Sequence, residues 1–357
     1  MLIKNSSLLL KIAGLGLLSL TFSTCKRQSA APEKPNVLFV IFDDLRPELG
    51  FNGSKAITPN LDRFGEMSVT FNRAYCNIPV CGASRASLLS GIRPTFNTFL
   101  HYDSSAEEDA PDAITLPEHF KNNGYYTIAR SKVFGFPEDS KDSWHELWSP
   151  IDTSFWWRDY LDKENRFLDS IGGMAKGAYP FECADVHDTA YFDGKAVKMA
   201  VNDISRLKAK DEPFFLAVGL RKPHLPFNAP KAYWDLYDRS EFELPENYIP
   251  VNNSIPGQAY HNWSELRKYY GVPAKGPVSD SIAVSLLHGY YACVSYVDQL
   301  FGNLLAALKK EGLDKNTIVV VVGDHGFNLG EHGLWCKHSN FNTSLHSLLM
   351  VHVPGMT

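Results

Sequence analysis

The sequence has few cysteines and none of the spacings in which cysteines usually build structure. Its six cysteines are spread over 357 residues and no two form a C-x-x-C pair, which argues against a zinc knuckle and a dense disulfide framework. It also lacks a basic tail or a run of lysines, and its formal net charge is −5, so we expect no nucleic acid partner. No internal repeat is apparent. An anionic substrate would need a local cluster of cations to hold it against this mild overall repulsion.

Apolar runs long enough to span a bilayer are also missing, and the run at the N-terminus is too short. Residues 12–22 are apolar and end shortly before Cys25. This pattern predicts an export signal over residues 1–24 and a lipoprotein modified on Cys25, with plain secretion or an uncleaved anchor as alternatives. Residues 26–35 are polar and predict a linker, which leaves residues 36–357 as the catalytic domain. We expect the chain in the periplasm or at the cell surface, held to a membrane only by lipid.

The composition, 44% apolar and 21% charged residues, suits one large or two unequal globular domains. Three continuous apolar runs predict strands covered on both faces, at residues 36–42, 213–219 and 317–322. Short strands are also expected at 69–71, 126–129 and 345–353. Two expected helices begin at Thr58 and Cys81, and three more cover 116–123, 189–209 and 281–311. This alternation predicts a three-layer α/β sandwich with a mainly parallel central sheet. Residues 134–182 and 221–279 lack the pattern and are expected to form loops.

Charged side chains follow the three predicted buried strands at their carboxyl ends. They are Asp43 and Asp44 after the first strand, Lys222 and His224 after the second, and Asp324 and His325 after the third. Ligands of open α/β sheets bind beyond the carboxyl ends of the strands, so we expect these side chains at one rim. Each carboxylate also has a structural alternative, because Asp43 and Asp44 could cap a turn and Asp324 could belong to an ordinary one. Their convergence favours a functional site.

The stretch 77–95 contains the pentapeptide C-G-A-S-R, from Cys81 to Arg85, at the expected start of an amphipathic helix. The pentapeptide resembles the signature of the sulfatase family, in which a cysteine is followed by any residue, Pro or Ala, Ser and Arg. Further blocks occur in family order and resemble the branch of iduronate-2-sulfatase and its bacterial relatives, at 36–44, 131–134, 214–227 and 323–340. The resemblance therefore spans nearly the whole chain after the export signal.

The resemblance implies an alkaline-phosphatase-like fold and a nucleophile made after translation. In the family the signature cysteine is oxidised to formylglycine, so Cys81 is expected to need a formylglycine-generating or anaerobic sulfatase-maturating enzyme. The resemblance also implies calcium, a hard cation that prefers oxygen ligands, held by Asp43, Asp44, Asp324 and residue 81. The family places His325 beside the metal. Because imidazole is an unusual calcium ligand, His325 could instead orient the sulfate.

The same resemblance assigns roles to the cations and to one histidine. Arg85 lies one helical turn after the cysteine and would hold the hydrated aldehyde. One hydroxyl of that hydrate would attack sulfur, and the other would then expel sulfate. His224 would protonate the leaving sugar oxygen with help from Lys132, while Lys337 and Lys222 would bind the substrate. The plainer alternatives are a surface cation for Arg85, a loop-anchoring histidine for His224 and solvated ammonium groups for the lysines.

The expected substrate is a sulfate ester on a carbohydrate, and within this branch a 2-O-sulfated uronic acid of a glycosaminoglycan-like polysaccharide. One alternative is a phosphonate or phosphate monoester hydrolase of the same fold with the same formylglycine. Another is a lipoprotein that binds sulfated glycans without turning them over.

The sequence departs from the family pattern in two places. Gly135 stands where close relatives carry a histidine that touches the sulfate region, which bears on substrate identity. The chain also stops shortly after the predicted strand at 345–353, whereas the family continues with a smaller subdomain of antiparallel strands. We therefore expect a catalytic domain without its C-terminal subdomain.

Overall fold

A computed structural model describes residues 34–150, 158–173, 175–210, 212–248, 255–260 and 264–356. Contacts between residues divide the chain into two units, Met1–Lys34 and Pro35–Thr357. The predicted export signal, Cys25 and nearly all of the predicted linker lie outside the described residues, so these expectations stay predictions. None of the helices described is both long and apolar enough to cross a membrane.

The second unit is built on a central sheet of seven strands, in the order β2-β11-β8-β1-β6-β3-β4. β8, β1, β6, β3 and β4 run parallel, while β11 runs antiparallel to both of its neighbours, β8 and β2. The mainly parallel sheet expected from the sequence is therefore confirmed. The strands are β1 Asn36–Asp43, β2 Val69–Thr70, β3 Tyr126–Ser131, β4 Glu146–Trp148, β6 Phe214–Pro223, β8 Thr317–Gly323 and β11 Leu349–His352.

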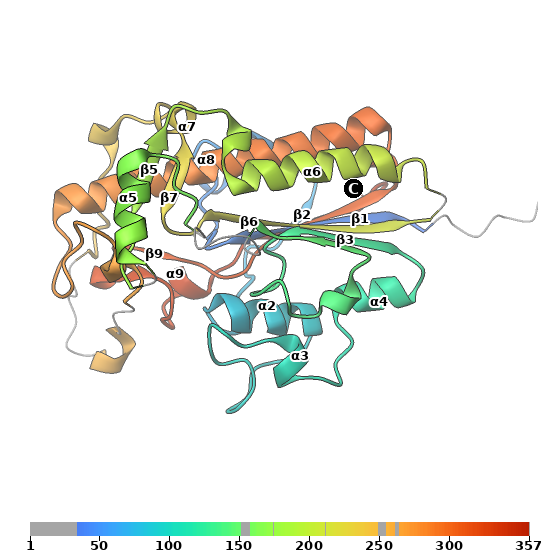
Figure 1. The fold of residues 1–357 in the computed structure, drawn as a ribbon, viewed down its shortest axis with the longest axis horizontal. Helices are drawn as coiled ribbons and strands as arrows, with labels where there is room; N and C mark the ends of the chain where they lie inside the picture. The colour runs from blue at the N-terminus through green and yellow to red at the C-terminus, as the bar shows by residue number, and fades with distance from the viewer. Residues whose placement is uncertain are drawn as a thin grey trace, which may run out of the picture. The chain divides into compact units, whose positions relative to one another are not determined.

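Helices cover both faces of this sheet and complete three layers (Figure 1). α1 Pro59–Glu66, α6 Phe192–Leu207 and α8 Asp280–Glu311 lie on one face, and α2 Cys81–Ser90, α3 Ala106–Asp109 and α4 Leu116–Asn122 lie on the other. β1 is buried along its whole length, and its alternate residues enter two separate apolar cores. A strand that is apolar on both faces needs a helical layer on each side, which explains its continuous apolar run.

Two segments expected to be loops contain regular structure, so that expectation was wrong in part. Residues 134–182 include β4, the helix α5 Lys163–Gly172 and the first two residues of the strand β5 Phe181–Ala184. Residues 221–279 include β7 Phe227–Pro230, which pairs in parallel with β5, and the short helix α7 Lys231–Trp234. These elements are short and are stabilised by partners distant in sequence, so periodicity does not reveal them.

Other boundaries differ from the expected ones by a few residues. The helix expected at 189–209 is Phe192–Leu207 after the 3-10 turn Asp188–Ala190. The strand expected at 345–353 is limited to Leu349–His352, because Asn342–Leu345 forms the helical turn α9. A two-stranded ribbon, β9 Asn328–Leu329 and β10 Trp335–Cys336, follows β8.

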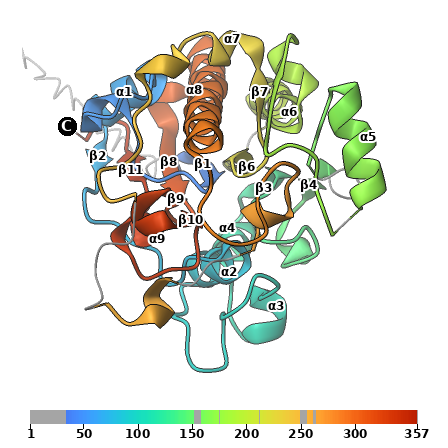
Figure 2. The ribbon, with the colours of Figure 1, turned by 90° about the vertical axis from the view of Figure 1, so that its left-hand side faces the viewer.

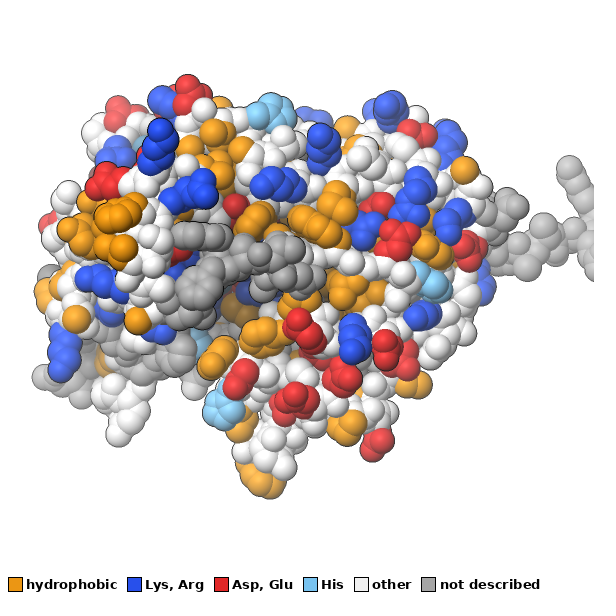
Figure 3. Space-filling view, in the orientation of Figure 1, with side chains coloured by type: hydrophobic (Ala, Val, Ile, Leu, Met, Phe, Trp, Pro, Cys, Tyr) orange, Lys and Arg blue, Asp and Glu red, His pale blue; other side chains and the backbone are white. Residues whose placement is uncertain are grey.

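The carboxyl ends of β8, β1, β6 and β3 lie side by side, because these strands are consecutive neighbours in the sheet. Figure 2 looks onto this edge, with the start of α2 on one side and the ribbon of β9 and β10 close by. On the face shown in Figure 3, basic side chains lie over α6 and acidic ones gather lower down, where α3 carries Glu107, Glu108 and Asp109. The strand ends therefore define the place at which charged residues from distant segments meet.

Candidate active site

Four potential metal ligands converge at the carboxyl edge of the sheet. Asp43 ends β1, Cys81 is the first residue of α2, and Asp324 and His325 follow β8. One ligand atom from each lies within 4.8 Å of the others. The Cys81 Sγ is 3.2 Å from Asp43 Oδ1 and 3.2 Å from His325 Nε2. The rim expected from the strand ends thus brings carboxylates, a histidine and the signature cysteine together.

Asp44 lies next to this group but belongs to a second one, which it forms with Cys81 and His224. Its backbone is in the left-handed region, with a φ of 66°, and its amide donates to Asp324 Oδ1 at 3.1 Å. Asp43, Asp44 and Asp324 are all buried, so neither Asp43 nor Asp44 is a solvated turn residue. The hydrogen bond from the Asp44 amide to Asp324 therefore holds the turn after β1.

Arg85 lies beneath these carboxylates and its side chain is 0% exposed. Its Nε donates to Asp324 Oδ2 at 2.8 Å, and its Nη2 lies 3.7 Å from Asp43 Oδ1. Its Nη1 donates to the carbonyls of Lys132 and Val133, which ties the loop after β3 to α2. Burial opposes the charge of Arg85, but the two aspartates outweigh burial and raise the pKa of the guanidinium. The alternative of a surface cation is excluded by this burial.

Two lysines each pair with one of the neighbouring carboxylates Asp43 and Asp44. Lys132 follows β3 and its Nζ bonds Asp43 Oδ2, while Lys337 follows β10 and its Nζ lies 2.9 Å from Asp44 Oδ1. Both ammonium groups are largely buried. Burial works against the charge of Asp43, but Lys132 and the other nearby cations bring the pKa of that carboxyl well below its ordinary value. Neither lysine is a solvated surface cation.

His224 lies on the loop after β6 and faces the same space. Its Nε2 is 2.9 Å from Glu265 Oε1, and its Nδ1 meets the carbonyl of Leu225. Lys222 uses its Nζ to donate to the carbonyls of His224, at 2.9 Å, and of Pro226. The ammonium of Lys222 therefore braces the loop that carries His224, and substrate binding by Lys222 stays a prediction.

Glu265 is a residue that the sequence reasoning missed. Its other oxygen, Oε2, lies 3.3 Å from the Nζ of Lys337, so the carboxylate joins His224 to Lys337. The residue lies in the stretch 221–279, where no periodic pattern distinguishes one acid from another. Because contacts distant in sequence define its place, only the structure identifies it.

A cleft of about 440 Å³ opens above these groups. Six of the predicted residues line it, Asp43, Cys81, Lys132, Lys222, His224 and Lys337, and Tyr102, Phe136 and Glu265 contribute to its wall. Arg85, Asp44, Asp324 and His325 do not line the cleft and are buried. The predicted residues therefore divide into a group at the surface of the cleft and a group that supports it.

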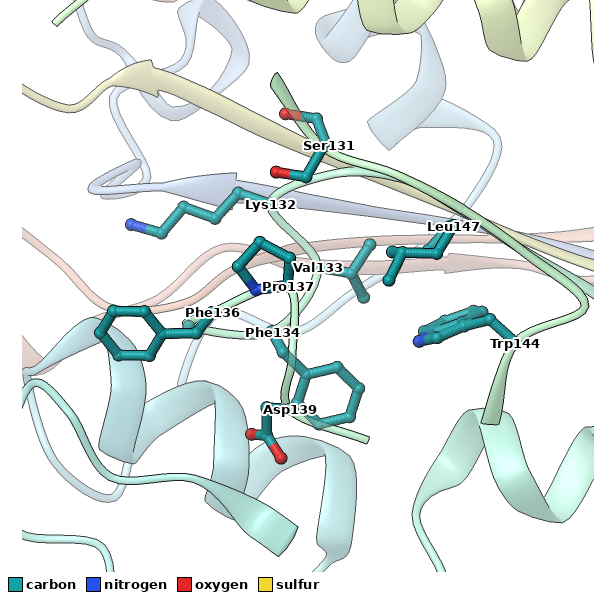
Figure 4. A pocket seen from close by; sticks show the side chains of 12 residues that line it. Ser131, Lys132, Val133, Phe134, Phe136, Pro137, Asp139, Trp144 and Leu147 are labelled. Carbon is teal, nitrogen blue, oxygen red and sulfur yellow. The ribbon is translucent and has the colours of Figure 1, made fainter. Parts of the chain in front are cut away.

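The loop after β3 forms one wall of the cleft and carries Gly135. Figure 4 shows Lys132 and Phe136 extending to one side of this loop and Val133 to the other. A Cβ placed on Gly135 would lie 2.8 Å from the Cα of Gly82, closer than real Cβ contacts. The backbone of the loop rests directly on the start of α2, so this backbone has no room for a side chain at position 135.

The environment of Cys81 does not favour a thiolate. Burial, followed by the charge of Asp43, raises the pKa of the thiol well above its ordinary value. A cysteine nucleophile depends on a lowered pKa, so the unmodified side chain is poorly suited to attack. The first turn of α2 begins at this residue, and free N–H groups at a helix start favour an anion.

The donor set fits calcium. Three buried carboxylates, Asp43, Asp44 and Asp324, offer the oxygen atoms that calcium prefers, and Arg85, Lys132 and Lys337 supply three opposing charges. A divalent ion would leave this cluster with a positive surplus, which favours an anionic substrate. His325 is the unusual member, because its ring nitrogens lie near Asp44 and Asp324 but nitrogen is a poor calcium donor.

Comparison with solved structures gives the fold. The phosphonate monoester hydrolase SpPMH from Silicibacter pomeroyi has a TM-score of 0.70 at 20% identity, over 91% of this chain and 69% of that one. A 2-O GAG sulfatase has a TM-score of 0.66 at 20% identity, over 91% of this chain and 65% of that one. The expected alkaline-phosphatase-like architecture, shared by sulfatases and phosphonate hydrolases, is confirmed.

Sequence comparison gives the family. Iduronate 2-sulfatase from Mus musculus is 34% identical over 356 residues, which cover 96% of this chain and 64% of the mouse protein. The chain thus spans less than two thirds of that relative's length. A family model described as Sulfatase matches residues 35–356, the whole of the second unit except its last residue. With the signature cysteine seated among the carboxylates at the sheet edge, the chain belongs to the sulfatase family.

Proposed function

We propose that this protein hydrolyses a sulfate ester on a carbohydrate, with a formylglycine derived from Cys81 and with calcium. The observation that carries the proposal is the position of Cys81, whose Sγ lies 3.2 Å from both Asp43 and His325. The likeness to iduronate 2-sulfatase supports a narrower substrate, a 2-O-sulfated uronic acid of a glycosaminoglycan-like polysaccharide. The name of the solved 2-O GAG sulfatase is in line with this class.

Formylglycine would supply the nucleophile, and calcium would supply part of the positive charge. A formylglycine at position 81 would supply a hydrated aldehyde as the nucleophile, and calcium, which Asp43, Asp44 and Asp324 would hold, would supply Lewis-acid chemistry. Arg85 orients this centre, because it bonds Asp324 and is fixed by two carbonyls of the loop after β3. Among the described residues its Nη2 has no hydrogen-bond partner, so one donor is available for a further oxygen near Asp43.

The surface groups of the cleft would handle the ester itself. Lys132 and Lys337 present buried positive charge at the edges of the carboxylate cluster and would attract the sulfate. His224 lines the cleft and would donate a proton to the leaving sugar oxygen, which is a poor leaving group without one. His325 lies below Cys81 and would either contact the metal or orient the sulfate.

A second candidate is a phosphonate or phosphate monoester hydrolase, because the fold is shared with SpPMH. A sulfate monoester carries one negative charge and a phosphate monoester nearly two, and phosphatases of this fold usually add a second metal. Among the described residues, the two groups of candidate ligands, one with Asp43 and Asp324 and one with Asp44, share Cys81, which favours a single metal and the sulfate ester.

The direct test is turnover of an aryl sulfate and the matching aryl phosphate by protein produced together with a maturating enzyme. We expect release of sulfate and little or no release of phosphate. Turnover of phosphate alone would support the second candidate, and turnover of neither would favour a protein that only binds sulfated glycans. The peptide containing residue 81 should be lighter than the cysteine form by about 18 Da, because one sulfur and two hydrogens are replaced by one oxygen.

We also propose export and attachment by lipid at Cys25, on the basis of the apolar run at residues 12–22. Detergent partitioning of the protein expressed in a bacterium would test this attachment. Cys25→Ala should move the protein from the detergent phase to the aqueous phase, and an unchanged partition would contradict the lipid anchor.

A further inference from the structure

We infer that Glu265 is a positioning residue that holds His224 and Lys337 at the mouth of the active site. The inference rests on the proposed sulfatase function and adds a residue to it. Glu265 Oε1 lies 2.9 Å from His224 Nε2, and Oε2 lies 3.3 Å from Lys337 Nζ. Each carboxylate oxygen therefore contacts one of the two side chains. A single acid fixes the distance between the predicted proton donor and a predicted substrate-binding lysine.

The three side chains are shielded from water and come from different segments. They are 16%, 13% and 4% exposed for Glu265, His224 and Lys337, respectively. His224 follows β6, Lys337 follows β10, and Glu265 directly precedes a 3-10 turn at Leu266–Lys268. Low exposure strengthens ion pairs and charge-assisted hydrogen bonds relative to those on a surface.

The backbone around Glu265 is fixed, so its carboxylate is a defined reference point. The neighbouring Leu266 is buried in the larger apolar core, and Tyr269 is buried three residues further on. The Lys268 amide donates to the Glu265 carbonyl at 3.2 Å, and the Lys268 carbonyl accepts from the Gly177 amide at 2.8 Å. A side chain anchored in this way can hold its partners more exactly than one on a free loop.

Both partners of Glu265 are held at a second point as well. His224 meets the Leu225 carbonyl through Nδ1, so the ring is restrained through both nitrogens. Lys337 bonds Asp44 at 2.9 Å, so its ammonium lies between two carboxylates. Without Glu265, the ring would lose its contact at Nε2, and the lysine would lose one of its two carboxylate partners. The predicted proton donor would then be less well aligned with the leaving oxygen.

Loss of alignment should matter most for esters whose leaving group needs a proton. A sugar alcohol is a poor leaving group and depends on protonation, whereas a nitrophenol leaves readily without it. A carboxylate with a purely structural role would affect both esters alike. The ratio of the two activities therefore separates positioning from structural support.

The experiment compares Glu265→Gln with the wild-type protein, both matured, on a 2-O-sulfated uronate and on 4-nitrophenyl sulfate. We expect kcat for the sugar ester to fall by about 10- to 100-fold and kcat for the aryl ester to change by less than about 3-fold. Glu265→Asp, which keeps the charge on a shorter side chain, should recover part of the sugar activity and serves as the second variant if Glu265→Gln does not fold.

Two controls make the result specific. Glu331→Gln removes another largely buried carboxylate, paired with Arg46 at 2.6 Å outside the cleft lining, and should leave the ratio of the two activities unchanged. In a His224→Ala background, Glu265→Gln should reduce activity on the sugar ester by a smaller factor than in the wild type, because one of the two side chains that it positions is already missing. Equal losses on both esters would overturn the inference. A wild-type protein that splits neither ester would instead overturn the proposed function.

Discussion

The floor and the wall of the cleft are built differently. We call Asp43, Asp324, Arg85 and the start of α2 the floor, because they lie at strand ends and on a helix, either at the base of the cleft or buried beneath it. The wall comes from loops and includes Phe136, 39% exposed, and Tyr102, 62% exposed. The comparison indicates that the proposed reaction would rest on the rigid sheet edge, whereas recognition of the proposed sugar substrate would rest on loops.

The difference has a structural cause. The β1 strand is hydrogen-bonded to β6 on one side and β8 on the other, so the position of Asp43 relative to Asp324 follows from the register of the sheet. Phe136 depends on a loop that crosses α2 at Gly82. Changes in the floor should therefore abolish activity, and changes in the wall should alter substrate preference.

The largest effect is expected for Cys81→Ala, which removes the precursor of the nucleophile. Turnover of any sulfate ester should fall by more than about 10⁴-fold, while thermal stability changes little because the side chain is small. Activity assays and a melting curve check both statements. Substantial residual turnover would show that position 81 is not the source of the nucleophile.

The second largest effect is expected for Asp324→Ala. Calcium content and activity should be lost together, and the protein should be destabilised by about 3–5 kcal/mol because Arg85 would lose its partner while buried. Metal analysis, turnover and denaturant unfolding measure the three quantities. Asp203→Ala, which breaks the buried pair with Arg130 outside the cleft lining, should destabilise the protein but leave calcium bound. Full activity of the wild type in excess chelator would contradict the metal role.

An intermediate effect is expected for Gly135→Ala, where the wall touches the floor. A methyl group 2.8 Å from the Gly82 Cα must displace the loop, since a backbone atom cannot rotate away. We expect a loss of about 1–3 kcal/mol of stability and a reduced kcat. Gly53→Ala, a glycine with nothing near its Cβ position but a φ of 84°, is a control for backbone strain without a clash. Equal kcat values for Gly135→Ala and Gly53→Ala would show that the contact of Gly135 with Gly82 does not affect catalysis.

The smallest effect is expected for Phe136→Ala, which changes the wall alone. Loss of one exposed ring that could stack on a sugar should raise KM for a sulfated saccharide by about 3- to 10-fold and leave kcat nearly unchanged. KM for an aryl sulfate without a sugar should change less. A fall in kcat instead would show that wall and floor are coupled more closely than their contacts indicate.

The floor could be predicted from the sequence because each of its acids follows a continuous apolar run. Such runs identify buried parallel strands, and the carboxyl ends of neighbouring strands meet, so Asp43 and Asp324 could be placed together before the structure was seen. The placement of Arg85 beside Cys81 also followed from their spacing of one helical turn. The spacing of Cys81 and Arg85 is local in the sequence, and the positions of Asp43 and Asp324 are set by the sheet.

The wall could not be predicted in the same way. β5 and β7 are four residues long and pair with each other across a long intervening segment, so neither shows a clear period. Glu265 acquires its partners only through the packing of the segment around Leu266. The contact of Gly135 with Gly82 depends on the path of a loop backbone, which no side-chain pattern encodes.

The burial of α2 also bears on whether the proposed oxidation of Cys81 comes before or after folding. Gly82, Ala83, Ser84 and Arg85 are buried, and Arg85 is bonded to the loop after β3. A maturating enzyme that binds the chain on both sides of residue 81 would not reach these buried residues once the contacts exist. The proposed oxidation of Cys81 would therefore come while the polypeptide is still extended, and a natively folded chain offered to such an enzyme should keep its sulfur.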